Sequence, residues 1–194
     1  MQPDLIAVTL KVIQVLESLS IPYVLSGSMA STVYGFARTT LDSDLVAPLS
    51  LDHLPAFVHA LREEFYLSEE AIAQAIQHQS SFNLIHLTTM FKVDIFIPKA
   101  HNFEHSQLAN ATPHLFEEHP NAIIYLASPE DTILAKLEWY RLGGELSERQ
   151  WRDVVGIVQV QGQRLDVDYM RQAAQELAVA DLLERLLQLI MNGK

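Results

Sequence analysis

Acidic side chains that could hold a divalent cation occur as a close pair early in the chain. Asp42 and Asp44 lie two residues apart, directly before the apolar run 45–47, which is predicted to be a strand. If the pair enters a strand, both carboxylates project from one face, with Cα atoms roughly 6.5 Å apart. Two hard anions so placed suit Mg²⁺, which takes one or two carboxylates together with water and phosphate oxygens.

A third candidate ligand, Asp94, lies in a later apolar segment. Residues 81–87 and 90–97 alternate apolar and polar side chains, which predicts an antiparallel hairpin with Lys92, Asp94 and Phe96 on one face. A carboxylate in so apolar a strand is costly to bury unless it is paired or metal-bound. We therefore interpret Asp94 as the third ligand; the alternatives are an outward-facing position or an ion pair with Lys92. Lys92 could itself contact a triphosphate or be structural.

A glycine turn precedes the acidic pair. The apolar run 23–25 breaks at Ser26-Gly27-Ser28, and a helix is predicted from residue 29 to residue 34. Gly27 allows close approach of backbone and ligand, and free N–H groups at the helix start beside the Ser28 hydroxyl favour an anion such as phosphate. The alternative is an ordinary turn with Ser28 as N-cap. Arg38 could hold phosphate or be a solvent-facing loop residue.

These residues together resemble the nucleotidyltransferase superfamily of the polymerase-beta type. The family pattern is Gly with Gly or Ser, a spacer, and then Asp, an apolar residue, and Asp or Glu; here thirteen residues separate Ser28 from Asp42. Ser26 and Ser43 stand where an apolar residue is usual. Gly35, Arg38 and Thr40 look most similar to a bacterial branch that includes abortive-infection toxins of the AbiEii class.

The resemblance implies transfer of a nucleoside monophosphate from an NTP to an acceptor with release of pyrophosphate. It implies two Mg²⁺ ions held by Asp42, Asp44 and Asp94, with nucleotide contacts from Gly27, Ser28, Arg38, Lys92 and Lys136. The acceptor, whether a protein, a tRNA or a small molecule, stays open, as do an antitoxin partner and a homo-oligomer. The alternative is a non-catalytic nucleotide-binding or regulatory module, and a metal-dependent nuclease ranks last.

From residue 128 onward the chain contains helix signals only. Ser128 with Pro129 marks a helix start, and helices are predicted over 129–141, 147–160, 166–177 and 180–191. Asp131 and Lys136 resemble an Asp-to-Lys motif of the abortive-infection branch, in which the lysine points toward the nucleotide; the alternative is a capping acid followed by a solvated lysine. Asp166, in a second Asp-x-Asp, is most simply a helix cap.

Aromatic and histidine side chains give weaker signals. Trp139, Tyr140 and Trp151 could stack on a base, although aromatic residues at helical spacing more often belong to the core. Four histidines lie in a region predicted to be a loop, without spacing that favours a zinc site: His101, His105, His114 and His119.

Composition excludes several classes of protein. A content of 49% hydrophobic and 19% charged residues supports a sizeable core, and no cysteine is available for disulfides or thiolate sites. The N-terminus lacks a basic residue before Lys11, unlike a secretory signal, which predicts a cytoplasmic protein without a membrane span. The net charge of −11 disfavours extensive nucleic-acid binding and favours a small nucleotide carried with Mg²⁺.

The predicted fold is α+β, with a mixed sheet flanked by helices. Residues 4–19 and 68–77 predict helices, the second with Ser68 as its N-cap, and residues 51–65 predict a further helix. Residues 121–127 predict a strand. We expect a nucleotidyltransferase-like core over residues 1–127 and a helical part over 128–194. The apolar face of the last helix could be core or a self-association surface, and comprises Leu182, Leu183, Leu186, Leu187 and Ile190.

Overall fold

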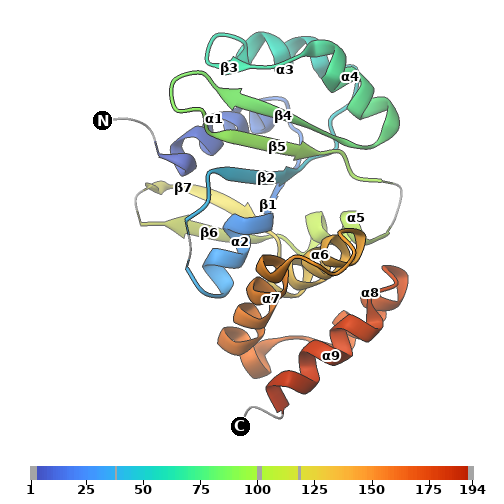
Figure 1. Cartoon of the computed structure of the whole chain (residues 1–194). Coiled ribbons are helices and arrows are strands. Elements are labelled where there is room, and N and C mark those ends of the chain that lie inside the picture. The colour runs from blue at the N-terminus through green and yellow to red at the C-terminus, as the bar shows by residue number, and fades with distance from the viewer. Residues whose placement is uncertain (1–3, 38, 100–101, 118, 192–194) are drawn as a thin grey trace. The chain divides into compact units, whose positions relative to one another are not determined.

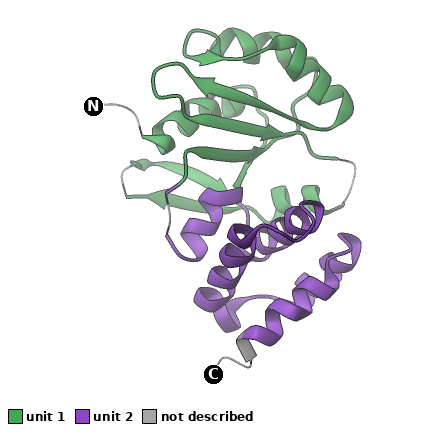
Figure 2. Ribbon diagram, in the orientation of Figure 1, with its two compact units in different colours: residues 1–26, 40–126 green, residues 27–39, 127–194 purple. Residues whose placement is uncertain are grey.

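The computed structural model describes residues 4–37, 39–99, 102–117 and 119–191. The chain forms two compact units, shown in Figure 2, and each is made of two separate segments. Unit 1 comprises Met1–Ser26 and Thr40–Leu126, and unit 2 comprises Gly27–Thr39 and Ala127–Lys194. Residues 27–39 therefore belong with the C-terminal helices.

Unit 1 is built on one mixed sheet with the strand order β3-β4-β5-β2-β1-β7-β6 (Figure 1). The described strands are β1 (Val24–Ser26), β2 (Asp42–Val46), β3 (Phe65–Tyr66), β4 (Ser81–His86), β5 (Lys92–Phe96), β6 (Thr112–Phe116) and β7 (His119–Leu126). β2 pairs with β5, and β1 with β7, in parallel; the other neighbours are antiparallel. The predicted mixed sheet and the β4–β5 hairpin are confirmed.

One face of this sheet is covered by helices. α1 (Leu5–Ser18) begins at the N-cap Asp4, whose side chain accepts a hydrogen bond from Ala7 N–H. α3 (Leu54–Leu61) packs Phe57 against Phe82 of β4, with ring centroids 6.1 Å apart. α4 (Glu69–His78) begins after Ser68, the N-cap that the sequence predicts. Alternate residues of β2 and β5 are fully buried, which gives this face an apolar core.

Three predictions for unit 1 need correction. The helix predicted over 51–65 is shorter, because Phe65 leaves it and pairs with His86 in the sheet. The strand predicted over 45–47 begins earlier, at Asp42. The region predicted as a loop forms α5 (Asn102–Ala109) and β6, so His105 is helical and His114 lies in a strand; His119 begins β7. His101 lies outside the described residues.

In the described residues of unit 2, all regular secondary structure is helical. The helices are α2 (Gly27–Tyr34), α6 (Pro129–Leu142), α7 (Glu148–Gln161), the short 3-10 helix η1 (Gly162–Arg164), α8 (Val167–Glu176) and α9 (Ala180–Met191). Ser128 and Asp166 cap α6 and α8 as predicted, each accepting a hydrogen bond from a backbone N–H three residues later. Leu182, Leu183 and Leu186 are buried, so this part of α9 contributes to the core.

α2 packs against α6 and α7 within unit 2. A Cβ placed on Gly35, at the end of α2, would lie 2.9 Å from Ile157 N and 3.1 Å from Gly156 C on α7. Gln161 on α7 also donates a hydrogen bond to the Tyr34 carbonyl at 2.8 Å. The two backbones therefore meet at a point where Gly35 has no room for a larger residue. Across the described residues, every helix is too short or too polar to cross a bilayer.

Candidate active site

Two of the predicted carboxylates occupy neighbouring positions in the sheet of unit 1. The parallel pairing of β2 with β5 places Asp44 beside Asp94 and Asp42 beside Lys92. Neighbouring strands lie about 4.8 Å apart, so Asp44 and Asp94 leave the same face at close range. Asp42 lies on that face too, because it is two residues before Asp44. Each of these acids is only partly exposed.

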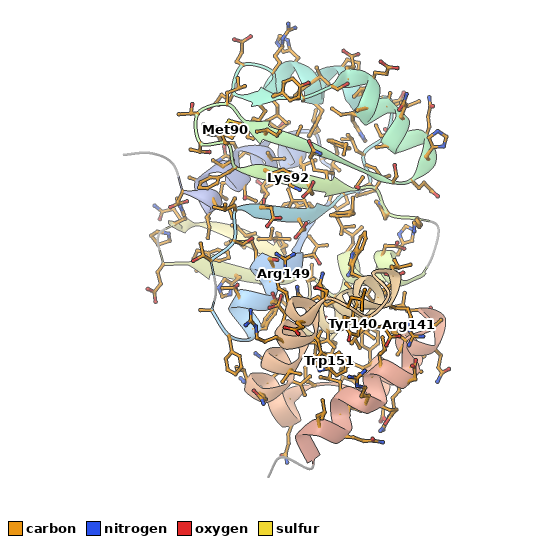
Figure 3. The ribbon with its side chains drawn as sticks, viewed as in Figure 1. Met90, Lys92, Tyr140, Arg141, Arg149 and Trp151 are labelled. Atoms are coloured by element: carbon orange, nitrogen blue, oxygen red, sulfur yellow. The ribbon has the colours of Figure 1, made fainter. Side chains whose placement is uncertain are left out.

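Lys92 shares this face and pairs with one of the acids. Lys92 Nζ lies 2.7 Å from Asp94 Oδ2, and the side chains are 41% and 17% exposed. The hydrogen bond to Asp94 raises the pKa of Lys92, and the negative charges of Asp94, Asp42 and Asp44 raise it further, against the opposing effect of burial. A single ammonium therefore interacts with the charge of all three carboxylates. Figure 3 labels Lys92 on β5.

In this conformation the acids are not arranged as a ready-made metal cage. Among the residues that the structure describes, no group of three acidic or histidine side chains is positioned to hold one metal ion. Asp94 is paired with Lys92, and Asp42 Oδ1 accepts a hydrogen bond from Thr40 Oγ1 at 2.5 Å. The strand register thus brings the predicted ligands to one face, where Asp94 is paired with a lysine and Asp42 with a threonine.

Ser43, which departs from the family pattern, has a polar partner on the opposite face of the sheet. Its side chain is fully buried and its Oγ lies 2.9 Å from Thr9 Oγ1 of α1. Thr9 Oγ1 also bonds to the Leu5 carbonyl at 2.7 Å. A buried serine is tolerated between two acids because α1 supplies a hydroxyl to satisfy it. The hydrogen bond between Thr9 and Ser43 links α1 to the strand that carries Asp42 and Asp44.

The glycine turn directly follows β1, whose last residue Ser26 is the register partner of Asp44. Gly27 has φ +59°, a left-handed conformation that favours glycine, and it is the first residue of α2. The helix therefore begins two residues earlier than predicted, and Ser28 lies within its first turn and not at its cap. The Ser28 carbonyl accepts a hydrogen bond from Ser31 Oγ at 3.0 Å. Phosphate binding at Gly27 and Ser28 stays a prediction.

Lys136, the nucleotide-binding candidate in unit 2, is buried in an ion pair. Its Nζ lies 2.8 Å from Asp153 Oδ2 and 3.1 Å from Gln150 Oε1, with the lysine and aspartate side chains 5% and 7% exposed. The alternative of a solvated lysine is therefore wrong. Its role toward a nucleotide stays a prediction. Arg38 lies outside the described residues.

Other candidates of unit 2 serve its packing. Asp131 is fully buried and accepts a hydrogen bond from the Tyr169 hydroxyl at 2.5 Å. Tyr140 and Trp151, labelled in Figure 3, have ring centroids 5.4 Å apart, and the guanidinium carbon of Arg185 lies 4.5 Å from the Trp151 ring centroid. Sequence reasoning missed Asp153 and Gln150 as partners of Lys136, since they lie 17 and 14 residues away.

Comparison with solved structures identifies the fold. The solution structure of the antibiotic-resistance factor ANT(2'')-Ia matches with a TM-score of 0.53 and 12% identity, over 91% of this chain and 94% of that chain. The crystal structure of ANT(2")-Ia in complex with adenylyl-2"-tobramycin matches with a TM-score of 0.52 and 10% identity, over 87% and 95%. An antigenic nucleotidyltransferase-like protein from Paracoccidioides brasiliensis matches with a TM-score of 0.50 and 19% identity, over 91% of each chain.

The chain therefore has the nucleotidyltransferase fold, as its glycine turn and acidic pair predict. No protein-family model matches the sequence, and no curated protein matches it. The resemblance to the AbiEii-class branch stays a prediction.

Proposed function

We propose that the chain is a Mg²⁺-dependent nucleotidyltransferase, which transfers a nucleoside monophosphate from an NTP to an acceptor with release of pyrophosphate. The observation that carries this proposal is the parallel register of β2 with β5, which aligns Asp44 with Asp94 and puts Asp42 on the same face. The fold supports the same reaction class, because two solved neighbours are ANT(2'')-Ia structures and one of these holds an adenylylated small molecule, adenylyl-2"-tobramycin.

The residues on this face fit a divalent cation. Three carboxylates form a hard oxygen donor set of high negative charge, and Mg²⁺ needs only one or two of them beside water and phosphate oxygens. We assign Asp42, Asp44 and Asp94 as ligands. The metal would supply positive charge against the triphosphate and lower the barrier to displacement at the α-phosphorus. The chain's own part is to hold the three carboxylates in fixed relative positions on two hydrogen-bonded strands.

The bonds and charges balance without a further reactant. The acceptor oxygen forms a bond to the α-phosphorus, the bond from that phosphorus to the bridging oxygen breaks, and pyrophosphate leaves with the electron pair. The acceptor proton passes to a base, and we assign this role to Asp94 once its pair with Lys92 opens. Gly27, Ser28, Arg38, Lys92 and Lys136 stay the proposed nucleotide contacts.

A labelling experiment tests this function. The full chain is incubated with Mg²⁺, a cell lysate and each NTP in turn, labelled at the α-phosphate, and both the labelled acceptor and released pyrophosphate are measured. We expect labelling by the wild-type chain and a loss of at least about 100-fold in Asp44→Asn or Asp94→Asn, since positioning and charge supply most of the catalysis. Asp52→Asn is the control, because Asp52 is an exposed turn residue of the same unit.

Two results would contradict the proposal. Labelling at the wild-type rate by a folded Asp44→Asn variant removes the carboxylates from the mechanism. Calorimetric binding of Mg²⁺-NTP without any pyrophosphate release, with every NTP and lysate, instead supports the non-catalytic module.

A further inference from the structure

A cation from the chain itself approaches the candidate metal ligands. The Lys92 ammonium lies 2.7 Å from Asp94 Oδ2, and Lys92 is the register partner of Asp42 on the adjacent strand. Lys92 and Asp94 are two residues apart on β5, so both side chains leave the sheet on the same side. The ammonium and a divalent cation would therefore use the same carboxylate oxygens.

Of these two partners, the lysine is the one that can move. Asp94 lies on a strand that is paired on both sides, and its register partners are Asp44 on β2 and Asn83 on β4. Its short side chain is 17% exposed, whereas that of Lys92 is 41% exposed and has a flexible four-carbon stem. Exchange of a ligand at Asp94 therefore requires only rotation of the Lys92 side chain, while the strands stay in register.

The charges on this face also favour exchange. Three carboxylates lie on this face, and the Lys92 ammonium offsets the charge of one of them. A divalent cation is then still attracted to the site, but it must displace a hydrogen-bonded cation from Asp94. The ion pair lowers the repulsion among the acids when no metal is bound, and it weakens metal binding by the same interaction.

We propose that Lys92 is a built-in competitor of the divalent cation: it occupies Asp94 in the metal-free protein and leaves it when the metal binds. This inference rests on the proposed function, because it takes Asp42, Asp44 and Asp94 as the ligands. The released ammonium stays on the same face of the sheet, where its charge suits the phosphate oxygens of a metal-bound nucleotide. Metal loading and release of the lysine for nucleotide are then one event.

Metal affinity measured without nucleotide tests this competition. The full chain is stripped of metal and titrated with Mn²⁺ alone, and free Mn²⁺ is followed by its electron paramagnetic resonance signal. We expect Lys92→Met to bind Mn²⁺ about tenfold more tightly than the wild type, and Lys92→Gln to show the same direction, because each removes the competing charge. Lys92→Arg keeps the charge and should bind no more tightly than the wild type.

Lys11→Met is the matched control. Lys11 is also a lysine of unit 1 in an ion pair, with Glu64, and its loss changes the net charge by the same amount. We expect its Mn²⁺ affinity to equal that of the wild type. Added salt should reduce the difference in Mn²⁺ affinity between Lys92→Met and the wild type. The Lys92 ammonium is partly exposed, so salt screens its interaction with the carboxylates.

Thermal unfolding supplies a second readout. In EDTA, Lys92→Met should melt at a lower temperature than Lys11→Met, since Asp94 loses its paired ammonium beside two other acids. Saturating Mn²⁺ should raise the melting temperature of Lys92→Met by more than that of the wild type.

The outcomes separate this inference from the function on which it rests. Equal or weaker Mn²⁺ binding by Lys92→Met overturns the competition, whereas loss of Mn²⁺ binding in Asp44→Asn shows that the metal site itself stands. If Lys11→Met gains as much Mn²⁺ affinity as Lys92→Met, the competition is also overturned, because the gain is then an effect of net charge. Failure of the wild type and of Lys92→Met to bind Mn²⁺ at all overturns both proposals.

Discussion

At the scale of single residues, Gly35 shows how strictly a packing contact can specify an amino acid. An added Cβ would meet three backbone atoms within 3.1 Å, at Ser31, Gly156 and Ile157. Backbone atoms cannot rotate away, so a methyl group at this position must force α2 and α7 apart.

We predict that Gly35→Ala lowers the free energy of unfolding by roughly 1–3 kcal/mol, as overpacking does in other cores. Gly156→Ala is the matched comparison: its Cβ would meet the Phe36 ring at 2.9 Å, and that side chain is 58% exposed and free to turn. Because alanine also favours a helix interior, Gly156→Ala should cost little or nothing. Urea unfolding of the two variants measures the difference, and equal losses would contradict this account.

The candidate site residues stand out from the sequence to different extents. Asp42 and Asp44 stand out because two acids at strand spacing follow a glycine turn, and Asp94 because an acid interrupts an apolar strand. The contact of Ser43 with Thr9 joins residues 34 positions apart, so no local pattern indicates it. The burial of Lys136 was also missed. Its partner Asp153 lies far away in the sequence, and a lysine in a helix is usually solvated.

At the scale of elements, the β4–β5 connection depends on a buried histidine. His86 is 2% exposed, and its Nδ1 lies 2.9 Å from Thr89 Oγ1 and 3.4 Å from the Thr89 N–H that donates to it. Its ring packs edge-on against Phe65, with centroids 5.3 Å apart. An Nδ1 that accepts from a backbone N–H carries no proton, so the neutral ring suits this turn.

We predict that this histidine makes the protein less stable in mild acid. Burial lowers the pKa of His86 below its ordinary value of 6.5; the positive charge of Lys11 lowers it further, and Glu64 opposes both. The unfolded chain then binds a proton more readily than the folded chain, so the stability that the neutral ring contributes above pH 6.5 is lost as pH falls through and below that value.

His86→Asn tests this prediction, because the amide oxygen keeps an acceptor near the position of Nδ1 and does not titrate. Urea unfolding between pH 7.5 and pH 5.5 should show a smaller loss of stability in the variant than in the wild type. The same slope in both proteins would show that His86 is not the group responsible.

Elements with strong periodicity or clear caps were predicted well, and short strands at the edges of the sheet were not. α1, α4, α6 and α8 each begin at a capping side chain, at Asp4, Ser68, Ser128 and Asp166. β3 has only two residues and exists because Phe65 and Tyr66 pair with β4. β6 likewise depends on β7, and its Pro113 argues locally against a strand. Such short edge strands leave no signal of their own in the sequence.

At the scale of the whole chain, unit 2 is discontinuous. Residues 27–39 follow β1 of unit 1, yet α2 packs on α6 and α7, which begin at Pro129 and Glu148. A sequence boundary near residue 127 describes where the helical region starts, but it cannot reveal that an earlier helix belongs with it. The amphipathic pattern of an eight-residue helix such as α2 does not specify its partner.

We predict that a chain ending at residue 127 leaves residues 27–39 without a packing surface. Limited proteolysis should cut this segment at least about tenfold faster than in the full chain, because α2 loses both partner helices and the hydrogen bond from Gln161 to the Tyr34 carbonyl. Cleavage in the turn at residues 87–91 serves as the internal control, since its partners lie in unit 1. Equal cutting of 27–39 in both chains would contradict the prediction.

The two-segment composition of unit 2 also sets an order of events at the ribosome. Residues 27–39 emerge early, while α6 begins only at Pro129, so about 90 residues must be translated before their docking partners exist. At ~5–20 residues per second this delay is roughly 5–18 s. During that interval the nascent chain carries the glycine turn and α2 undocked, and only the synthesis of α6 and α7 supplies the surface on which α2 packs.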